Sequence, residues 1–184
     1  MIDYLEYLAV FSGLLYLILI SKGLKSGWVF GILCAIIYTY MTFINRLYFQ
    51  SLLQFSYIFL GFWGYVNWGK EKTIQINALS LKTNLGLLVI GICLTLGFSY
   101  ILSFTNQKMA LLDSAVSVFS IIATVLTALK FIDNWIYWWF INVLAIYLYY
   151  MQNMEFTTVL YASYLVISIY GFIEWRAKLK AVYG

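Results

Sequence analysis

The clearest chemical signal in the sequence lies near residue 140, where two tryptophans and an asparagine recur at helical spacing. Trp135, Trp138 and Asn142 are three and four positions apart, so they lie on one face of an α-helix. The flanking residues are apolar enough for a membrane span. An amide that faced lipid would leave its polar atoms unpaired, at a cost on the order of several kcal/mol. We therefore expect Asn142 to face protein, a cavity or a ligand.

Two roles fit this stretch. Stacked indoles with an amide below them can form a cradle for a flat heteroaromatic molecule. Alternatively, Trp135 and Trp138 belong to the belt of aromatic residues at a membrane surface, and Asn142 joins two helices through hydrogen bonds. The choice between these roles depends on the elements that surround the stretch.

The composition indicates an integral membrane protein. Of the 184 residues, 64% are hydrophobic, 21% are aromatic and only 10% are charged, and the mean hydropathy is +0.89. A soluble protein of this size could not bury so much apolar surface. Cys34 and Cys93 lie inside apolar runs and predict neither a disulfide nor a metal site, and nothing in the sequence implies a cofactor. The acidic N-terminus lacks the basic start of a signal peptide, so we expect the first span to be retained.

Seven apolar runs are long enough to cross about 30 Å of hydrocarbon. They predict an all-α membrane domain over residues 1–184, with spans at 4–21, 28–44, 48–69, 84–103, 111–130, 135–151 and 156–176. The second and sixth runs are the shortest, and interfacial tryptophans are expected to complete them.

The basic residues predict the orientation, because they concentrate on the cytoplasmic side of membrane proteins. If the C-terminus is cytoplasmic, nine basic residues lie inside: Lys22, Lys25, Lys70, Lys72, Lys82, Lys130, Arg176, Lys178 and Lys180. Only Arg46 and Lys108 lie outside. We predict a multi-pass protein of the inner (plasma) membrane with its N-terminus outside. The net charge of +4 then reflects topology and gives no reason to expect a nucleic-acid partner.

An internal repeat relates the two halves of the chain. A shift of 107 positions, the separation of Trp28 from Trp135, also aligns Tyr40 with Tyr147, Tyr57 with Tyr164, Gly64 with Gly171 and Trp68 with Trp175. This register predicts a first three-helix repeat at 4–69, a connector helix at 84–103 and a second three-helix repeat at 111–176. The shift contains an even number of crossings, so the repeats are parallel. Such a 3+1+3 arrangement is typical of transporters, with the site between the repeats near the midplane.

The pattern Trp135-x-x-Trp138-x-x-x-Asn142 resembles the W-x-x-W-x-x-x-N signature of the Pnu family of vitamin transporters, which are relatives of the SWEET sugar transporters. The resemblance covers nearly the whole chain. It implies facilitated diffusion of an unphosphorylated vitamin, which a cytosolic kinase then traps. Nicotinamide riboside is the first expectation. Thiamine and riboflavin are the alternatives, because sister branches carry them on the same scaffold.

Further candidate contacts lie on three other spans. Gln54 and Tyr57 share a stripe of the third span, and Tyr161 and Tyr164 share the matching stripe of the seventh. Thr124 belongs to a row of hydroxyl residues in the fifth span. Threonine can also bond to its own helix backbone, which is the alternative for Thr124.

The residues also argue against two functional classes. The chain has no histidine, and its seven acidic residues fall at the ends of predicted spans or in loops. A membrane-embedded enzyme would need a nucleophile with a base, or metal ligands. A proton- or sodium-coupled carrier would be expected to hold ionisable groups within the membrane. We therefore predict an uncoupled transporter rather than an enzyme, with a passive channel or small-molecule receptor as the alternative. The sequence does not decide between a monomer and a homo-oligomer.

Overall fold

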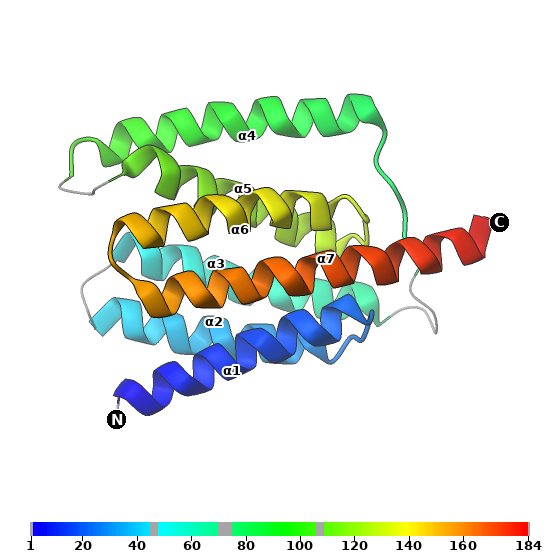
Figure 1. Ribbon diagram of the computed structural model, residues 1–184, viewed down its shortest axis with the longest axis horizontal. Coiled ribbons are helices and arrows are strands. Elements are labelled where there is room, and N and C mark those ends of the chain that lie inside the picture. The colour runs from blue at the N-terminus through cyan, green and yellow to red at the C-terminus, as the bar shows by residue number, and fades with distance from the viewer. Residues whose placement is uncertain (1, 45–47, 70–74, 106–108, 184) are drawn as a thin grey trace.

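The computed structural model describes residues 2–44, 48–69, 75–105 and 109–183, and these residues form seven α-helices (Figure 1). The helices are α1 (Ile2–Ser21), α2 (Gly27–Ile44), α3 (Tyr48–Trp68), α4 (Leu81–Leu102), α5 (Ala110–Ala128), α6 (Asn134–Met151) and α7 (Glu155–Tyr183). The predicted all-α class is confirmed, and the predicted span ends agree within three residues except in α7. That helix continues to Tyr183 instead of ending near residue 176. Arg46, Lys70, Lys72 and Lys108, which the orientation argument counted, lie outside the described residues.

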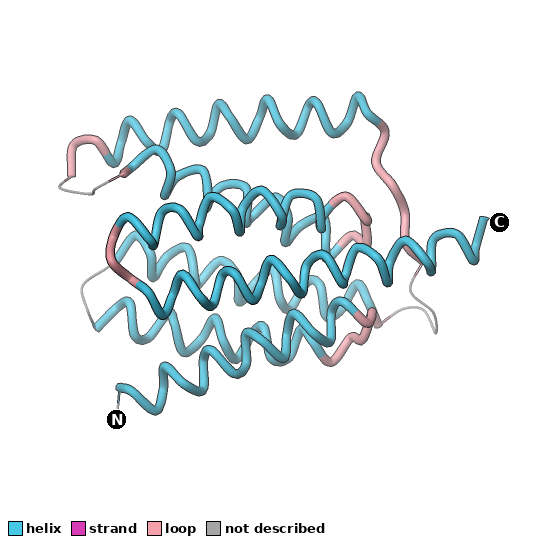
Figure 2. The backbone as a smooth tube through the Cα atoms, in the orientation of Figure 1, coloured by secondary structure: helices cyan, strands magenta, loops and turns pink. Residues whose placement is uncertain are grey.

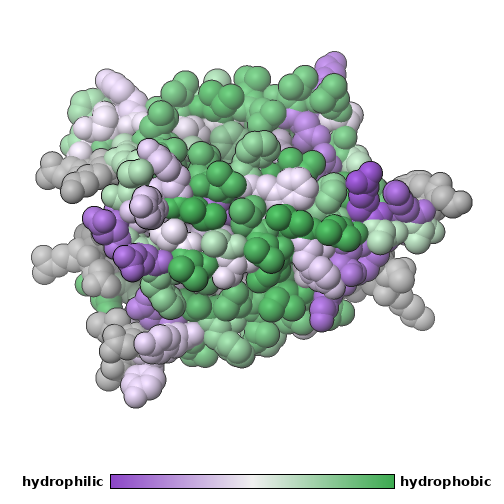
Figure 3. Space-filling view, viewed as in Figure 1, coloured by the Kyte–Doolittle hydropathy of each residue, from purple (hydrophilic) through white to green (hydrophobic). Residues whose placement is uncertain are grey.

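Five of the described helices are long and apolar enough to cross a membrane: α1, α2, α4, α5 and α7. The other two, α3 and α6, have 21 and 18 residues. Their amides and many aromatic side chains lower the hydropathy, although both run alongside the others (Figure 1). In the view of Figure 3, apolar side chains cover the middle of the surface and hydrophilic ones gather toward its two ends. This distribution fits a multi-pass membrane protein.

The helices pack as two groups of three with α4 at one edge. Within the groups, α2 contacts α1 and α3, and α6 contacts α5 and α7. The groups meet where α1 contacts α7 and where α3 contacts α5, whereas α4 packs mainly against α5. Figure 2 shows short loops between α1 and α2, between α5 and α6 and between α6 and α7, and a segment that leads into α4. Helix α1 begins at one end of the bundle and α7 ends at the other.

Glycines allow close helix contacts at equivalent places in the two groups. A Cβ on Gly64 would lie 2.5 Å from the Trp28 ring, and one on Gly171 would lie 2.5 Å from the Trp135 ring. Both distances are too short for a real contact, so only glycine lets each indole pack flat against the neighbouring helix. These contacts bury Trp28 and Trp135 almost completely.

The turn between α5 and α6 holds the segment that leads into α4. The backbone of Asn77 accepts from the Ile132 N–H (2.9 Å) and donates to the Lys130 carbonyl (3.1 Å). The Asp133 carboxylate accepts from the Leu79 N–H through Oδ2 and from the Asn84 side-chain amide through Oδ1, both at 2.8 Å. The start of α4 is thereby fixed beside the start of α6.

Candidate functional site

The predicted site residues of α6 face the interior of the bundle. Asn142 is 1% exposed, and its Oδ1 has no hydrogen-bond partner among the described residues. A buried amide oxygen without a partner costs about 1–3 kcal/mol, so such a group is suited to bind a donor. Trp138 is half-buried and packs against the two largest groups of core residues. Asn142 and Trp138 therefore lie between helices and away from lipid.

Trp135 occupies a different environment from the one a membrane-surface belt would give it. Its side chain is 1% exposed and meets the Trp175 ring edge-on, with centroids 5.5 Å apart. On its other side it packs against Gly171. The belt interpretation therefore does not fit Trp135, which supports the stretch from within the protein core.

Three predicted tyrosines come together between the two helix groups. Tyr161 stacks on Tyr149 of α6 with ring centroids 5.1 Å apart, and it meets Tyr164 edge-on at 5.6 Å. The Tyr57 hydroxyl of α3 lies within hydrogen-bonding reach of Ser120 on α5. Aromatic faces and hydroxyls thus gather from four helices, α3, α5, α6 and α7, of both groups.

Three further tyrosines, not anticipated from the sequence, complete this set. Tyr16 has Tyr57 and Cys34 as electrostatic neighbours, and Tyr38 has Tyr149 and Cys34. We call the six residues the tyrosine cluster: Tyr16, Tyr38, Tyr57, Tyr149, Tyr161 and Tyr164. A signal for Tyr149 exists in the sequence, because it lies seven positions after Asn142 and continues the same helical stripe.

The remaining predicted contacts are placed less centrally. Gln54 is half-buried on α3, three positions before Tyr57. Thr124 is buried, but its hydroxyl donates to the Ser120 carbonyl of its own helix at 2.7 Å. That bond is the alternative stated for threonine, and it makes Thr124 the weakest candidate.

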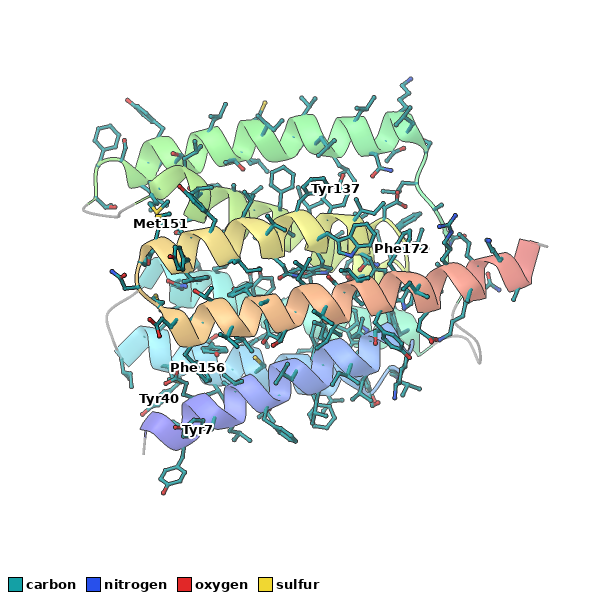
Figure 4. The ribbon with its side chains drawn as sticks, in the orientation of Figure 1. Tyr7, Tyr40, Tyr137, Met151, Phe156 and Phe172 are labelled. Carbon is teal, nitrogen blue, oxygen red and sulfur yellow. The ribbon has the colours of Figure 1, made fainter. Side chains whose placement is uncertain are left out.

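Other aromatic residues of α6 and α7 serve helix packing. Phe172 lies between α6 and α7, where it meets Trp139 edge-on at 5.0 Å (Figure 4). Tyr137 points from α6 toward α4, and its hydroxyl lies 3.4 Å from the Asn84 carbonyl oxygen. Tyr7 extends away from the bundle. Phe172 and Tyr137 thus pack the helices that carry the site, whereas Tyr7 does not.

The electrostatics of the site are simple. None of the tyrosine-cluster residues, nor Trp138 or Asn142, carries a formal charge at neutral pH. The described basic residues gather at one end of the bundle, after α1, within the first turn of α4, after α5 and in the last part of α7. Among the described residues, no group of three His, Cys, Asp or Glu side chains could hold a metal ion. The site can therefore offer stacking and neutral hydrogen bonds.

Apolar membrane helices around a buried, uncharged site of amide, hydroxyl and aromatic groups define the class of small-molecule membrane transporters. The chain belongs to the nicotinamide mononucleotide transporter family, whose family model matches residues 3–177. This result confirms the predicted transporter family and the prediction that the protein is not an enzyme.

Relatives and a solved structure agree with this family. A protein of Neisseria mucosa, named nicotinamide riboside transporter PnuC, is 28% identical over 194 residues, covering 97% of this chain and 74% of the relative. The protein of the same name from Haemophilus influenzae is 28% identical, with 97% and 81% covered. A crystal structure of the vitamin B3 transporter PnuC is similar with a TM-score of 0.81 at 26% identity, covering 97% of this chain and 83% of that chain.

Proposed function

We propose that this protein carries nicotinamide riboside across the membrane by facilitated diffusion. The observation that carries the proposal is the unpaired, buried oxygen of Asn142, which lies on the same helical stripe of α6 as Tyr149 of the tyrosine cluster. The names of the relatives support the same substrate. The carboxamide N–H groups or ribose hydroxyls of nicotinamide riboside are donors of the kind this oxygen lacks.

The chemistry of the site favours the riboside over the phosphorylated mononucleotide named in the family description. Nicotinamide riboside is a flat cation, and aromatic faces attract such a cation by about 0.5–2 kcal/mol, depending on its desolvation. A phosphate would call for Arg or Lys, as in most phosphate sites. The site residues named above include neither. A cytosolic kinase that phosphorylates the vitamin would then retain it in the cell.

We assign the substrate contacts to Trp138, Asn142, Gln54, Tyr57, Tyr161 and Tyr164. Trp135 supports Trp138 and Asn142 from the core side, and Thr124 is the peripheral member of the set. This assignment concentrates the polar groups on α3, α6 and α7.

The proposed architecture is a pair of parallel three-helix repeats, 4–69 and 111–176, joined by a connector helix at 84–103 in a SWEET-like 3+1+3 order, with all seven helices crossing the membrane. Contacts that recur at the same offset support it. Trp28 packs on Gly64 as Trp135 packs on Gly171, and Trp28 meets Trp68 as Trp135 meets Trp175.

Binding of the free vitamin tests the substrate. Calorimetric titration of the purified protein with nicotinamide riboside, nicotinamide mononucleotide, thiamine and riboflavin should give saturable binding that is strongest for nicotinamide riboside. Stronger binding of thiamine would replace the proposed substrate by the alternative one. Stronger binding of the mononucleotide would contradict the argument from charge.

We place the protein in the inner (plasma) membrane. In the proposed orientation, the N-terminus lies outside and the C-terminus lies in the cytoplasm. All seven described basic residues lie at the bundle end where α7 finishes, which supports this orientation. A reporter that is active only in the cytoplasm should work after Gly184 and fail before Met1. The reverse pattern would contradict this orientation and indicate the opposite one.

A further inference from the structure

Two tryptophans at the basic end of the bundle donate hydrogen bonds from one helix group to the other. Trp68 of α3 donates through Nε1 to the carbonyls of Thr127 and Ala128 at the end of α5, both at 3.2 Å. Trp175 of α7 donates through Nε1 to the carbonyl of Ile20 at the end of α1, also at 3.2 Å. Both indoles are buried, with 3% and 0% exposed. Carbonyls in the last turn of a helix are ready acceptors for such bonds.

The two bonds are copies of one interaction. Trp68 and Trp175 are 107 positions apart, and so are their acceptors Ile20 and Thr127. In each case the third helix of one group bonds to the first helix of the other group. The two indoles also meet, with ring centroids 5.9 Å apart. The contact between the groups is therefore reciprocal, and its two halves lie side by side.

Two more indoles fill the space beside this pair. Trp28 meets Trp68 edge-on at 5.6 Å, and Trp135 meets Trp175 edge-on at 5.5 Å. We call these four residues the tryptophan cluster. The Nε1 atoms of Trp28 and Trp135 are buried and have no hydrogen-bond partner among the described residues. The cluster thus closes this end of the bundle with apolar rings. Trp68 and Trp175 are the members that donate hydrogen bonds from one group to the other, and Asn67, next to Trp68, adds a further bond from α3 to the Ala128 carbonyl.

We propose that Trp68 and Trp175 are gate residues, whose paired hydrogen bonds hold the basic end of the transport path shut and break together when that end opens. The proposal rests on the proposed function, because it assumes a path between the two helix groups. Separation of α7 from α1 and of α3 from α5 must break both bonds, whereas the contacts of Trp28 and Trp135 with Gly64 and Gly171 stay within one group.

The native Cys34 provides a reporter behind the gate. It lies on α2 six residues deeper than Trp28, or about 9 Å along the helix. A Cβ on Gly13 would lie 3.4 Å from its Sγ and 2.8 Å from the Tyr164 hydroxyl, which places Cys34 beside the tyrosine cluster. The other cysteine, Cys93, is exposed on α4 and is removed as Cys93→Ser.

The experiment measures how fast a membrane-impermeant maleimide labels Cys34 in sealed vesicles without substrate. The reagent is applied on the side from which Lys180→Cys, an exposed position of α7, is labelled in a parallel sample. Trp68→Phe and Trp175→Phe keep an aromatic ring but lose the donor. Each should raise the labelling rate about fivefold, as expected for the loss of one hydrogen bond. Trp63→Phe is the matched control, because Trp63 of α3 is 41% exposed and lies outside the cluster.

The outcomes distinguish the opening of a gate from a general loosening of the helix packing. A rate that stays at the parent value in either Phe variant, or that rises equally in Trp63→Phe, would overturn the proposal. This readout needs no substrate, so it stands whether or not nicotinamide riboside is carried.

A second variant leaves all four tryptophans in place, in case the Phe variants do not fold. Lys178 of α7 donates to the Lys22 carbonyl after α1, so these positions adjoin the gate. Lys22→Cys with Lys178→Cys, in a Cys34→Ser/Cys93→Ser background, allows a reducible thiol cross-linker to tie α7 to α1. We expect the tied protein to bind nicotinamide riboside but to transport it at least tenfold more slowly until reductant is added. If the cross-linked variant transported nicotinamide riboside at the parent rate, the gate proposal would be overturned. If the parent protein, without any cross-link, did not transport nicotinamide riboside, the proposed function would be contradicted.

Discussion

At the scale of single residues, the side-chain amides differ in how they are used. Asn67 donates to the Ala128 carbonyl at 2.7 Å, and Asn134 donates to the Phe131 carbonyl at 2.6 Å. The first bond ties the end of α3 to the end of α5, whereas the second stays within the turn before α6, where the Oδ1 of Asn134 also has no partner among the described residues. Asn142 lies in the middle of α6, and its oxygen has no partner among the described residues. A buried acceptor kept unpaired in mid-helix is the residue most directly explained by a bound ligand.

We predict that Asn142→Ala and Trp138→Ala each weaken binding of nicotinamide riboside by about tenfold or more. Loss of a buried hydrogen-bond partner costs about 1–3 kcal/mol, and each 1.4 kcal/mol is about a factor of ten. Calorimetric titration of folded variants measures the change.

The control for this comparison follows from burial. Trp28 is unsuitable as a control, because it is packed against Gly64 and Trp68 in the core. Its removal would cost about 3–5 kcal/mol of stability and would confuse the result. Trp63→Ala removes an exposed indole instead and should leave binding unchanged. If Asn142→Ala binds as tightly as the parent, the amide only joins helices.

At the scale of helices, the structure depends on contacts between side chains of different helices, which the hydrophobic pattern of the sequence does not predict. The apolar runs predicted the helices well, because the bilayer thickness sets their length. The end of α7 was missed, since charged residues after Arg176 stop the apolar run without stopping the helix. The repeat paired Trp28 with Trp135 and Trp68 with Trp175, but one sequence cannot show that all four rings meet.

The tyrosine cluster was found only in part for the same reason. Tyr57 and Tyr164 are repeat mates, so the register singled them out. Tyr16 aligns with Ala123 and Tyr38 with Ala145, so the repeat gave no hint of either residue. Among 17 tyrosines in a membrane protein, residue type alone does not separate site from surface.

The glycine contacts predict a clear effect on stability. Gly171→Ala and Gly64→Ala should each destabilise the protein by about 1–3 kcal/mol, because the added methyl group overlaps a buried indole. Gly97→Ala on α4 is the control, since a Cβ there meets nothing within 4 Å and alanine favours a helix. Thermal unfolding in detergent should show a lower midpoint for the first two and no fall for the third. Equal midpoints would mean that the helices separate easily at these contacts.

The anchor at Asp133 gives a second prediction for the helices. Asp133→Ala removes the acceptors for the Leu79 N–H and the Asn84 amide, so the start of α4 should open more often. Trypsin should then cleave after Lys82 about fivefold faster or more. Glu155→Ala, at the exposed start of α7, is the matched control. An unchanged cleavage rate at Lys82 would show that other contacts hold the segment.

At the scale of the whole molecule, charge lies at the ends and neutral polar groups lie between the helix groups. Asp113 and Glu155 begin helices, and Asp133 holds a loop. The proposed site residues are uncharged, so an ion gradient has no evident partner there. The arrangement fits a carrier that equilibrates its substrate and leaves accumulation to later phosphorylation.

Uptake by proteoliposomes tests this account most directly. Purified protein is reconstituted into vesicles preloaded with unlabelled nicotinamide riboside, and radiolabelled nicotinamide riboside is added outside without any proton or sodium gradient. We predict rapid, saturable entry of label by exchange, with thiamine and riboflavin competing weakly and with the same final level when a gradient is imposed. Absence of exchange, entry that does not saturate, or accumulation driven by an ion gradient would contradict facilitated diffusion of nicotinamide riboside.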